Sequence, residues 1–457
     1  MVVGYGLGES MRTLCLILVM ALSLHGAETA AERDARMEWW RDARFGMFVH
    51  WGLYSGLAGT WKGKMVNDHG GMEWIQQRVG ADPYTYAAEA IPKFVPKEGF
   101  AEEWARMAKR AGCRYVVFTT KHHDGFALHD SGVTNYDAGD VVGRDLVREI
   151  VDALRAEGLK VGFYHSLIDW HHPQYDFKLM KALPYTKGSA NVAVTKRDHG
   201  KYVDFLHAQV KELMTGYGPI DVLWWDYSKK GAEGEAWRAT ELMKMVRAEN
   251  PAVIMNNRLY GIPKIEKHDA VGRLLSFNPS HGDFTTPEQT VPSRGVAGVD
   301  WEQCMTMNTT WGFSEHDKAW KSDEQLIRHL VDISSKGGNF LLNIGPTGDG
   351  SIPPESVKGL SAMGDWLKVN GESIYGTTAN PLEEVSFEGR CTAKGDALYL
   401  HVYARPEGGT ISLDHSGRQA TLLDGKVALK VSREGGKLVI QLPEELPDPV
   451  VTVIRVD

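Results

Sequence analysis

The stretch that decides the fold is residues 202–226, YVDFLHAQVKELMTGYGPIDVLWWD. Its first part, Tyr202–Tyr217, repeats apolar side chains at the three- and four-residue spacing of an amphipathic helix. Its second part, Ile220–Trp225, is a short apolar run, as expected for a buried strand. A helix that leads directly into such a strand is typical of a parallel sheet, so this stretch predicts an α/β domain.

The same alternation of apolar runs and amphipathic stretches recurs over roughly 330 residues. Six units at this spacing favour a (β/α)8-like TIM barrel over an open sheet, although one or two barrel strands are not recognisable. No Gly-rich phosphate loop follows the first strand, which argues against a dinucleotide-binding fold. The other predicted strands are Phe45–Trp51, Tyr115–Thr120, Val161–His165, Val253–Asn256 and Asn339–Ile344, and the other helices are Gly99–Ala111, Asp145–Glu157, Ala236–Glu249, Asp323–Ser334 and Glu355–Asn370.

The pattern changes near Gly376, where short alternating strands separated by Gly-rich turns begin. They predict a small antiparallel β-sandwich over residues 376–457, after a barrel domain over 32–375. All 14 tryptophans lie between Trp39 and Trp366, so the sandwich offers only Phe387, Tyr399 and Tyr403 for stacking, and we favour a structural role over carbohydrate binding. The predicted strands are Ala397–Tyr403, Thr410–Leu413, Val427–Val431, Lys437–Leu442 and Val450–Val456.

Residues 1–31 are predicted to be a secretory signal peptide, with Met11 as an alternative start. Arg12 precedes an apolar run over residues 14–24, and an Ala-rich exit places cleavage between about Ala27 and Ala31. The run is too short to span a bilayer comfortably, so stable membrane insertion is not expected. A buried hydrophobic helix is the alternative. We therefore expect a secreted or periplasmic protein.

Composition excludes several classes of protein. Of 457 residues, 43% are hydrophobic and 24% are charged, which excludes a disordered, collagenous or multi-span membrane chain. The net charge is −8 and no long basic run occurs, so no nucleic-acid partner is expected. The four cysteines are far apart and show no zinc-site spacing, and loss of Cys15 with the leader would leave at most one disulfide. The sequence carries no signal for an oligomeric state.

Polar and aromatic side chains follow five of the predicted strands. In barrel enzymes the active site lies where the C-terminal ends of the strands meet the loops. Turn chemistry alone would favour Gly, Asn, Asp and Ser at these positions, so five such endings together predict a functional site. The endings are His50-Trp51, Lys121-His122-His123-Asp124, Tyr164-His165, Trp224-Trp225-Asp226 and Asn256-Asn257-Arg258.

A catalytic metal and a serine nucleophile are both disfavoured. His122 and His123 are adjacent and point to opposite sides of a strand, and no HExxH motif occurs. No G-x-S-x-G elbow is present either. We therefore expect no metal and no cofactor.

A pair of carboxylates fits the pattern better. Asp226 ends an apolar strand and can act as a nucleophile if a second carboxylic acid stands nearby as proton donor. The loop-rich segment that follows offers Asp283, Glu288 and Glu302, each of which could also be a cap or a solvated loop charge. Aromatic faces and several hydrogen-bonding groups beside a carboxylate pair are what a sugar ring requires.

These residues resemble the α-L-fucosidases of glycoside hydrolase family 29, in order over roughly residues 36–375. The resemblance implies a catalytic barrel followed by a β-sandwich. It also implies a retaining exo-hydrolase that releases terminal α-L-fucose from oligosaccharides or glycoconjugates through a covalent fucosyl-enzyme. The matching segments are Trp39–Ser55, Glu73-Trp74, Phe118–Phe126, Gly162–Trp170, Ile220–Asp226, Trp301–Cys304 and Gly337–Gly350.

The resemblance also implies roles for individual residues. Asp226 matches the nucleophile, Glu288 is the preferred acid/base, and Glu302 is the second candidate. Trp311 or Phe313 is expected near the sugar methyl group. One departure from the family pattern is Tyr227, where a small residue such as Gly is often seen. The residues matched to sugar binding are His50, Glu73, Trp74, His122, His123, Tyr164, Trp224 and Arg258.

Two alternatives to a fucosidase remain at this point. One is a glycosidase for a related L-sugar, such as an α-L-galactoside, on the same scaffold. The other is a glycan-binding protein that has lost catalysis, although binding alone needs no carboxylate pair. The loops that would contact the leaving sugar give no indication of linkage preference.

Overall fold

The computed structural model describes residues 28–66, 71–175, 197–229, 231–261, 278, 281–296, 298–382 and 385–457. The chain divides into two compact units, residues 1–38 and 39–457, and helix α2 (Ala30–Ala43) crosses the division. Most of the predicted signal peptide, residues 1–27, lies outside the described residues. Among the helices that are described, none combines the length and the apolar character needed to cross a membrane.

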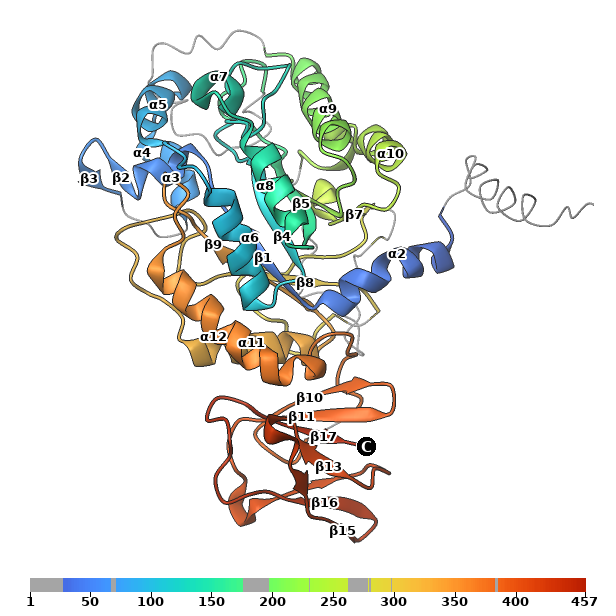
Figure 1. The fold of residues 1–457 in the computed structure, drawn as a ribbon. Helices are drawn as coiled ribbons and strands as arrows, with labels where there is room; N and C mark the ends of the chain where they lie inside the picture. The colour runs from blue at the N-terminus through green and yellow to red at the C-terminus, as the bar shows by residue number, and fades with distance from the viewer. Residues whose placement is uncertain are drawn as a thin grey trace, which may run out of the picture. The chain divides into compact units, whose positions relative to one another are not determined.

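A seven-stranded, fully parallel sheet forms the centre of the larger unit (Figure 1). Three isolated parallel bridges, Asn256 to Phe284, Thr285 to Trp301 and Glu288 to Cys304, link the two edges of the sheet. Residues 284–288 thus take the place of an eighth strand, and the predicted TIM-like barrel is confirmed. In the order around the sheet, the strands are β7 (Ile254–Met255), β6 (Val222–Asp226), β5 (Lys160–Ser166), β4 (Tyr115–Lys121), β1 (Phe45–Val49), β9 (Asn339–Ile344) and β8 (Glu302–Thr306).

The six predicted helices of the barrel are all present and alternate with the strands. Each places its apolar stripe against the sheet; in α8, for example, Leu146, Ile150 and Leu154 are fully buried. Short elements occupy the loops, chiefly those after β1. The main helices are α6 (Phe100–Ala111), α8 (Leu146–Ala156), α9 (His199–Gly216), α10 (Ala239–Glu249), α11 (Asp323–Ser335) and α12 (Pro354–Asn370), and the short elements are α3 (Leu53–Leu57), β2 (Thr60–Trp61), β3 (Lys64–Met65), α4 (Ile75–Val79), α5 (Pro83–Ala90) and α7 (Ala138–Val142).

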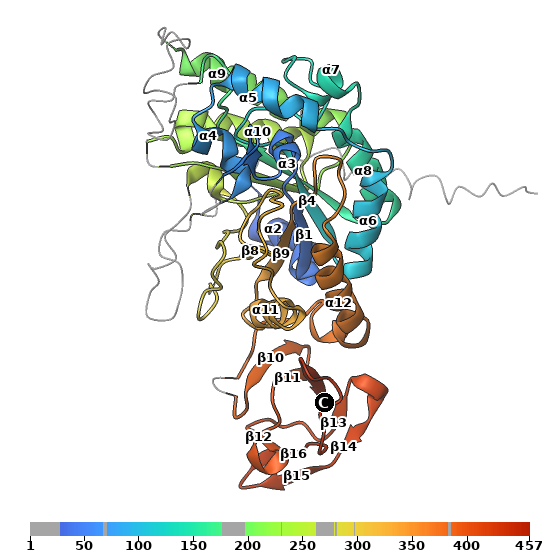
Figure 2. The same ribbon diagram turned by 90° about the vertical axis from the view of Figure 1, so that its left-hand side faces the viewer.

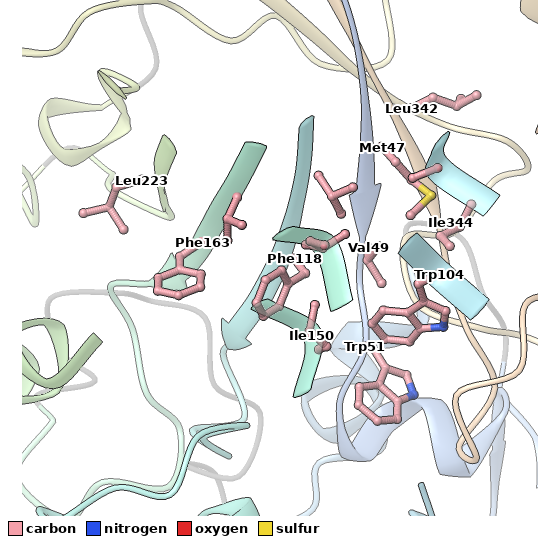
Figure 3. Packing of buried hydrophobic residues seen from close by; sticks show 14 of the residues in the cluster. Met47, Val49, Trp51, Trp104, Phe118, Ile150, Phe163, Leu223, Leu342 and Ile344 are labelled. Carbon is pink, nitrogen blue, oxygen red and sulfur yellow. The ribbon is translucent and has the colours of Figure 1, made fainter. Parts of the chain in front are cut away.

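The barrel core lies between the strands and this ring of helices (Figure 3). Val49 of β1 and Phe118 of β4 are buried there. Trp51 packs edge-on against Trp104 of α6, with ring centroids 5.1 Å apart. Burying side chains of this size contributes about 1.5–3 kcal/mol each, so the core holds the strand ends rigidly beneath the loops.

The C-terminal residues form two antiparallel sheets, which confirms the predicted β-sandwich. The predicted strand Val427–Val431 was wrong, because its residues divide between β14 (Ala428–Leu429) and β15 (Val431–Glu434), which lie in different sheets. Figures 1 and 2 show α11 and α12 between this sandwich and the barrel strands. The strand order of the five-stranded sheet is β10 (Gly389–Lys394), β11 (Ala397–Val402), β17 (Thr452–Val456), β13 (Ala420–Leu422) and β14. The strand order of the three-stranded sheet is β12 (Thr410–Leu413), β16 (Lys437–Gln441) and β15.

The aromatic side chains of the sandwich belong to its packing. Phe387 and Tyr399 are buried, and Tyr403 lies against the Arg328 guanidinium at 4.7 Å. Phe387 and Tyr399 therefore present no open face to a sugar. The described cysteines, Cys113, Cys304 and Cys391, are buried free thiols.

Candidate active site

A cavity of about 340 Å³ lies at the C-terminal ends of the barrel strands. Its size suits one sugar ring, at the lower end of ordinary ligand pockets. Every residue that the sequence assigned to catalysis or binding lines it, except the candidate carboxylates Glu302 and Asp283 and the alternative Phe313. The lining residues are Phe48, His50, Glu73, Trp74, His122, His123, Tyr164, Trp224, Asp226, Tyr227, Ser228, Lys229, Arg258, Glu288, Cys304 and Trp311.

Asp226, the last residue of β6, is held by both of its carboxylate oxygens. The Tyr164 hydroxyl donates a hydrogen bond to Oδ2 at 2.7 Å, and Nη1 of Arg258 donates to Oδ1 at 2.7 Å. Nε2 of His123 lies 3.8 Å from Oδ2. Because the side chain remains 15% exposed, a small molecule in the cavity can reach it. The arrangement fixes the direction of a carboxylate that faces the cavity.

Arg258 connects Asp226 to Glu288. Its Nη2 donates to Oε2 of Glu288 at 2.9 Å, and its Nε donates to the Thr286 hydroxyl at 2.7 Å. The guanidinium lies over the Trp224 ring, 4.3 Å from its centroid. Burial by itself opposes the charge, but Glu288 and Asp226 together raise the pKa of Arg258. One buried cation therefore holds two carboxylates at the same cavity.

Glu302, the second candidate for the proton donor, lies beneath the cavity and not in it. It is fully buried on β8 and accepts hydrogen bonds from the Tyr115 hydroxyl and from Nε1 of Trp224, the latter at 3.0 Å. Burial raises the pKa of Glu302 to about 7. Its contacts orient the Trp224 ring that supports Arg258. Asp283, the third candidate, accepts from Arg247 and from the Met255 backbone N–H.

The tautomer of His50 follows from its partners. Nδ2 of Asn343 donates to the Trp311 carbonyl at 2.8 Å, so Oδ1 of Asn343 is the acceptor that faces Nδ1 of His50 at 2.7 Å. Nδ1 therefore carries the proton and Nε2 has a free lone pair. Burial lowers the pKa of His50 to about 4, so the ring is neutral near pH 7.

The tautomer of His123 is fixed in the same way. The Ser166 hydroxyl donates to the Ile168 carbonyl at 2.8 Å, so it accepts from Nδ1–H of His123 at 2.7 Å. Burial lowers the pKa of both His122 and His123, and His122 stacks on Tyr164 with ring centroids 5.4 Å apart. Neutral imidazoles with bare Nε2 atoms at His50 and His123 require hydroxyl groups that donate to them, as sugar hydroxyls can.

Glu73 and Trp74 enter the cavity from a short 3-10 turn, Met72–Trp74. Oε2 of Glu73 accepts from the Gly312 backbone N–H at 3.1 Å, and burial raises the pKa of Glu73 to about 7. Gly71 has φ 106°, and a Cβ atom there would lie 2.0 Å from Oε1 of Glu73. Only glycine fits this position. In the sequence, the Gly70-Gly71 pair before Glu73 is the feature that could have indicated this need for glycine.

The cavity also contains residues that the sequence did not single out. Phe48 lies two residues before His50 on β1 and so faces the same side, as strand alternation would have indicated. Its ring lies 6.0 Å from that of Trp311, which itself lies 5.0 Å from His50. Cys304 of β8 lies 3.7 Å from Nη2 of Arg258. Ser228 and Lys229 complete the lining.

Tyr227, the departure noted in the sequence, directly follows Asp226 in an unusual backbone conformation. Its φ is 72°, the left-handed region that favours glycine, and an L-residue with a side chain pays about 1–2 kcal/mol to adopt it. Its ring packs 4.9 Å from His123 and 5.2 Å from Trp74, and Nζ of Lys229 lies 4.3 Å from the ring centroid. The strain is therefore offset by packing at the cavity wall.

Comparison with known proteins places this geometry in a family. The profile of the family described as Alpha-L-fucosidase matches residues 24–372. Tissue alpha-L-fucosidase of Homo sapiens is 31% identical, over 90% of this chain and 86% of the human protein.

Two solved structures are similar in fold as well. Alpha-L-fucosidase isoenzyme 1 from Paenibacillus thiaminolyticus has a TM-score of 0.82 and 40% identity, covering 93% of this chain and 99% of that one. A trapped covalent intermediate of an α-L-fucosidase from Bacteroides thetaiotaomicron has a TM-score of 0.80 and 28% identity, covering 95% and 98%. The chain therefore belongs to the α-L-fucosidase family, glycoside hydrolase family 29.

Proposed function

We propose that the protein is a retaining exo-α-L-fucosidase that hydrolyses terminal α-L-fucose from oligosaccharides or glycoconjugates. The observation that carries this proposal is the pair of carboxylates, Asp226 and Glu288, which both bind the buried guanidinium of Arg258 at a cavity of about 340 Å³. Retaining glycosidases need two carboxyl groups close together, one as nucleophile and one as acid/base.

In the first step Asp226 attacks the anomeric carbon. The new bond joins a carboxylate oxygen to that carbon, the bond to the leaving oxygen breaks, and Glu288 gives that oxygen its proton. In the second step Glu288 takes a proton from water, the water oxygen bonds to the anomeric carbon, and the carboxylate of Asp226 leaves. Tyr164 and Arg258 keep the carboxylate aimed in both steps.

The cavity offers a recognition surface suited to fucose. The bare Nε2 atoms of His50 and His123 accept from ring hydroxyls, as their fixed tautomers require. Phe48 and Trp311 form an apolar surface beside His50 that suits the methyl group. An apolar wall discriminates only about 100-fold against an added hydroxyl, so an α-L-galactoside is the competing substrate to measure.

The test is nitrophenol release from an aryl α-L-fucoside by the wild type, by Asp226→Ala and by Asp396→Asn. Asp396 is an exposed carboxylate in the sandwich and serves as the matched control. We expect turnover by the wild type and by the control. Asp226→Ala should lose its activity, and added azide should partly restore nitrophenol release by forming a fucosyl azide. Sugar binding without turnover in the wild type would instead indicate a non-catalytic glycan-binding protein. Faster hydrolysis of the L-galactoside would indicate the related specificity.

We also propose that the protein is exported, on the strength of Arg12, the apolar run over residues 14–24 and the Ala-rich exit. Expression of the whole chain in a bacterial host, followed by fractionation and N-terminal sequencing, tests this. The proposal expects an extracytoplasmic protein that begins between about Ala27 and Ala31. An uncleaved cytoplasmic chain would refute it.

A further inference from the structure

We infer that Tyr227 is a specificity-determining residue that closes the cavity beyond His123 and admits only fucosides with a free hydroxyl next to the anomeric carbon. The inference rests on the proposed fucosidase function and defines its substrate class further. A fucose carrying a substituent at that hydroxyl would be excluded by the Tyr227 ring.

The backbone at Tyr227 is the first observation. A φ of 72° directly after Asp226 is a conformation that glycine adopts without strain, yet a bulky aromatic residue stands there. Strained residues of this kind persist where the surrounding structure holds them, and they concentrate at ligand sites. The left-handed turn directs the Tyr227 side chain toward the cavity that Asp226 also faces.

The ring contacts of Tyr227 are the second observation. His123 and Trp74 lie 4.9 Å and 5.2 Å from its ring, and Lys229 places its ammonium 4.3 Å from the ring centroid. The phenol oxygen is buried and has no hydrogen-bond partner in the part of the chain that the structure describes. The ring is thus held by its faces and edges and acts as a wall, not as a hydrogen-bonding group.

The positions of the charged groups show which side of the sugar this wall faces. Glu288, which protonates the leaving oxygen, reaches Asp226 through Arg258 on the Oδ1 side. His123 approaches from the other side, with Nε2 3.8 Å from Oδ2. A hydroxyl that donates to this Nε2 beside the nucleophile is the one next to the anomeric carbon. Because Tyr227 packs against His123, its ring limits the space around that hydroxyl.

The experiment compares kcat/KM for a nitrophenyl α-L-fucoside with that for its 2-O-methyl derivative, in the wild type and in Tyr227→Gly. Glycine adopts this backbone conformation without strain, and the substitution removes the aromatic ring that closes the cavity. The selectivity ratio is kcat/KM for the plain fucoside divided by kcat/KM for the 2-O-methyl derivative. We expect this ratio to fall by about tenfold or more in the variant. The chemical effect of methylation on the sugar is the same for both enzymes, so it cancels in this comparison.

Two further variants separate the wall from a loss of folding. Tyr227→Phe keeps the ring and removes an unpartnered hydroxyl, so its ratio should stay at the wild-type value. Tyr227→Asn is a second small residue that tolerates this backbone, and its ratio should fall as in Tyr227→Gly. Ratios within about twofold of the wild type in both small variants would overturn the inference. A wild type unable to hydrolyse the plain fucoside would instead refute the proposed function.

Discussion

Oδ1 of Asn343 lies 2.7 Å from Nδ1 of His50, and this contact determines which nitrogen of His50 faces the cavity as an acceptor. The two residues are 293 positions apart in the sequence and meet because β9 and β1 pair in parallel. A carboxylate in place of this amide would put a negative charge beside Nδ1–H of His50.

Asn343→Asp should raise the pKa of His50 from about 4, because a carboxylate beside Nδ1–H stabilises the protonated ring. A protonated ring donates at Nε2 and can no longer accept from a sugar hydroxyl. The acidic limb of the kcat/KM profile should therefore move to higher pH, by about one unit or more. Asn339→Asp, the same change at the other end of β9, should leave the limb in place. An unshifted limb in Asn343→Asp would contradict the tautomer assigned to His50.

Glu288→Ala should slow fucosides with poor leaving groups far more than activated aryl fucosides. Loss of general-acid help costs about 100- to 10,000-fold when the leaving oxygen needs a proton and little when it does not. Rates for a series of aryl fucosides, plotted against the pKa of the leaving phenol, measure the effect. Glu302→Ala is the comparison, since Glu302 lies beneath Trp224 and outside the cavity. Leaving-group dependence in the Glu302 variant alone would make Glu302 the acid/base.

Glu302 should also give the fold a pH-dependent stability. Burial raises its pKa from 4.5 to about 7 in the folded protein, so between these values the folded state binds more protons than the unfolded state. Stability from this group is present below about pH 4.5 and is lost as the pH rises toward 7. Glu302→Gln cannot ionise, so its melting temperature relative to the wild type should increase between pH 5 and pH 8. A difference that is constant over this range would show that Glu302 stays ionised in the fold.

Much of the site could be predicted from the sequence because strand ends carry a readable signal. His50, Tyr164 and Asp226 follow apolar runs, and a parallel barrel necessarily brings such endings together. The apolar pattern alone does not indicate strand β8, because Glu302, Gln303 and Thr306 interrupt it. Their polar atoms are buried inside the barrel, which a one-dimensional pattern does not indicate.

Contacts between distant residues could not be predicted in this way. Asn343 and Ser166 look like ordinary polar strand residues until the fold places them against His50 and His123. The φ of Tyr227 is likewise a property of the turn after β6 and not of its residue type. What the sequence lacked was therefore the orientation of side chains and backbone around residues it had already identified.

Gly71 provides a test of how tightly Glu73 must be held. A Cβ atom at Gly71 would lie 2.0 Å from Oε1 of Glu73, so Gly71→Ala must displace that carboxyl group from the Gly312 N–H. Because a small misplacement of a binding group can cost about 100-fold, we expect kcat/KM for an aryl fucoside to fall by tenfold or more. Gly63→Ala is the matched control, since Gly63 also has a positive φ, 76°, but nothing lies within 4 Å of its added Cβ. Gly63→Ala also places a side chain at a positive φ but without a clash, so it should keep its activity, whereas Gly71→Ala should lose it. Equal activity in the two variants would show that Glu73 does not need its present position for turnover.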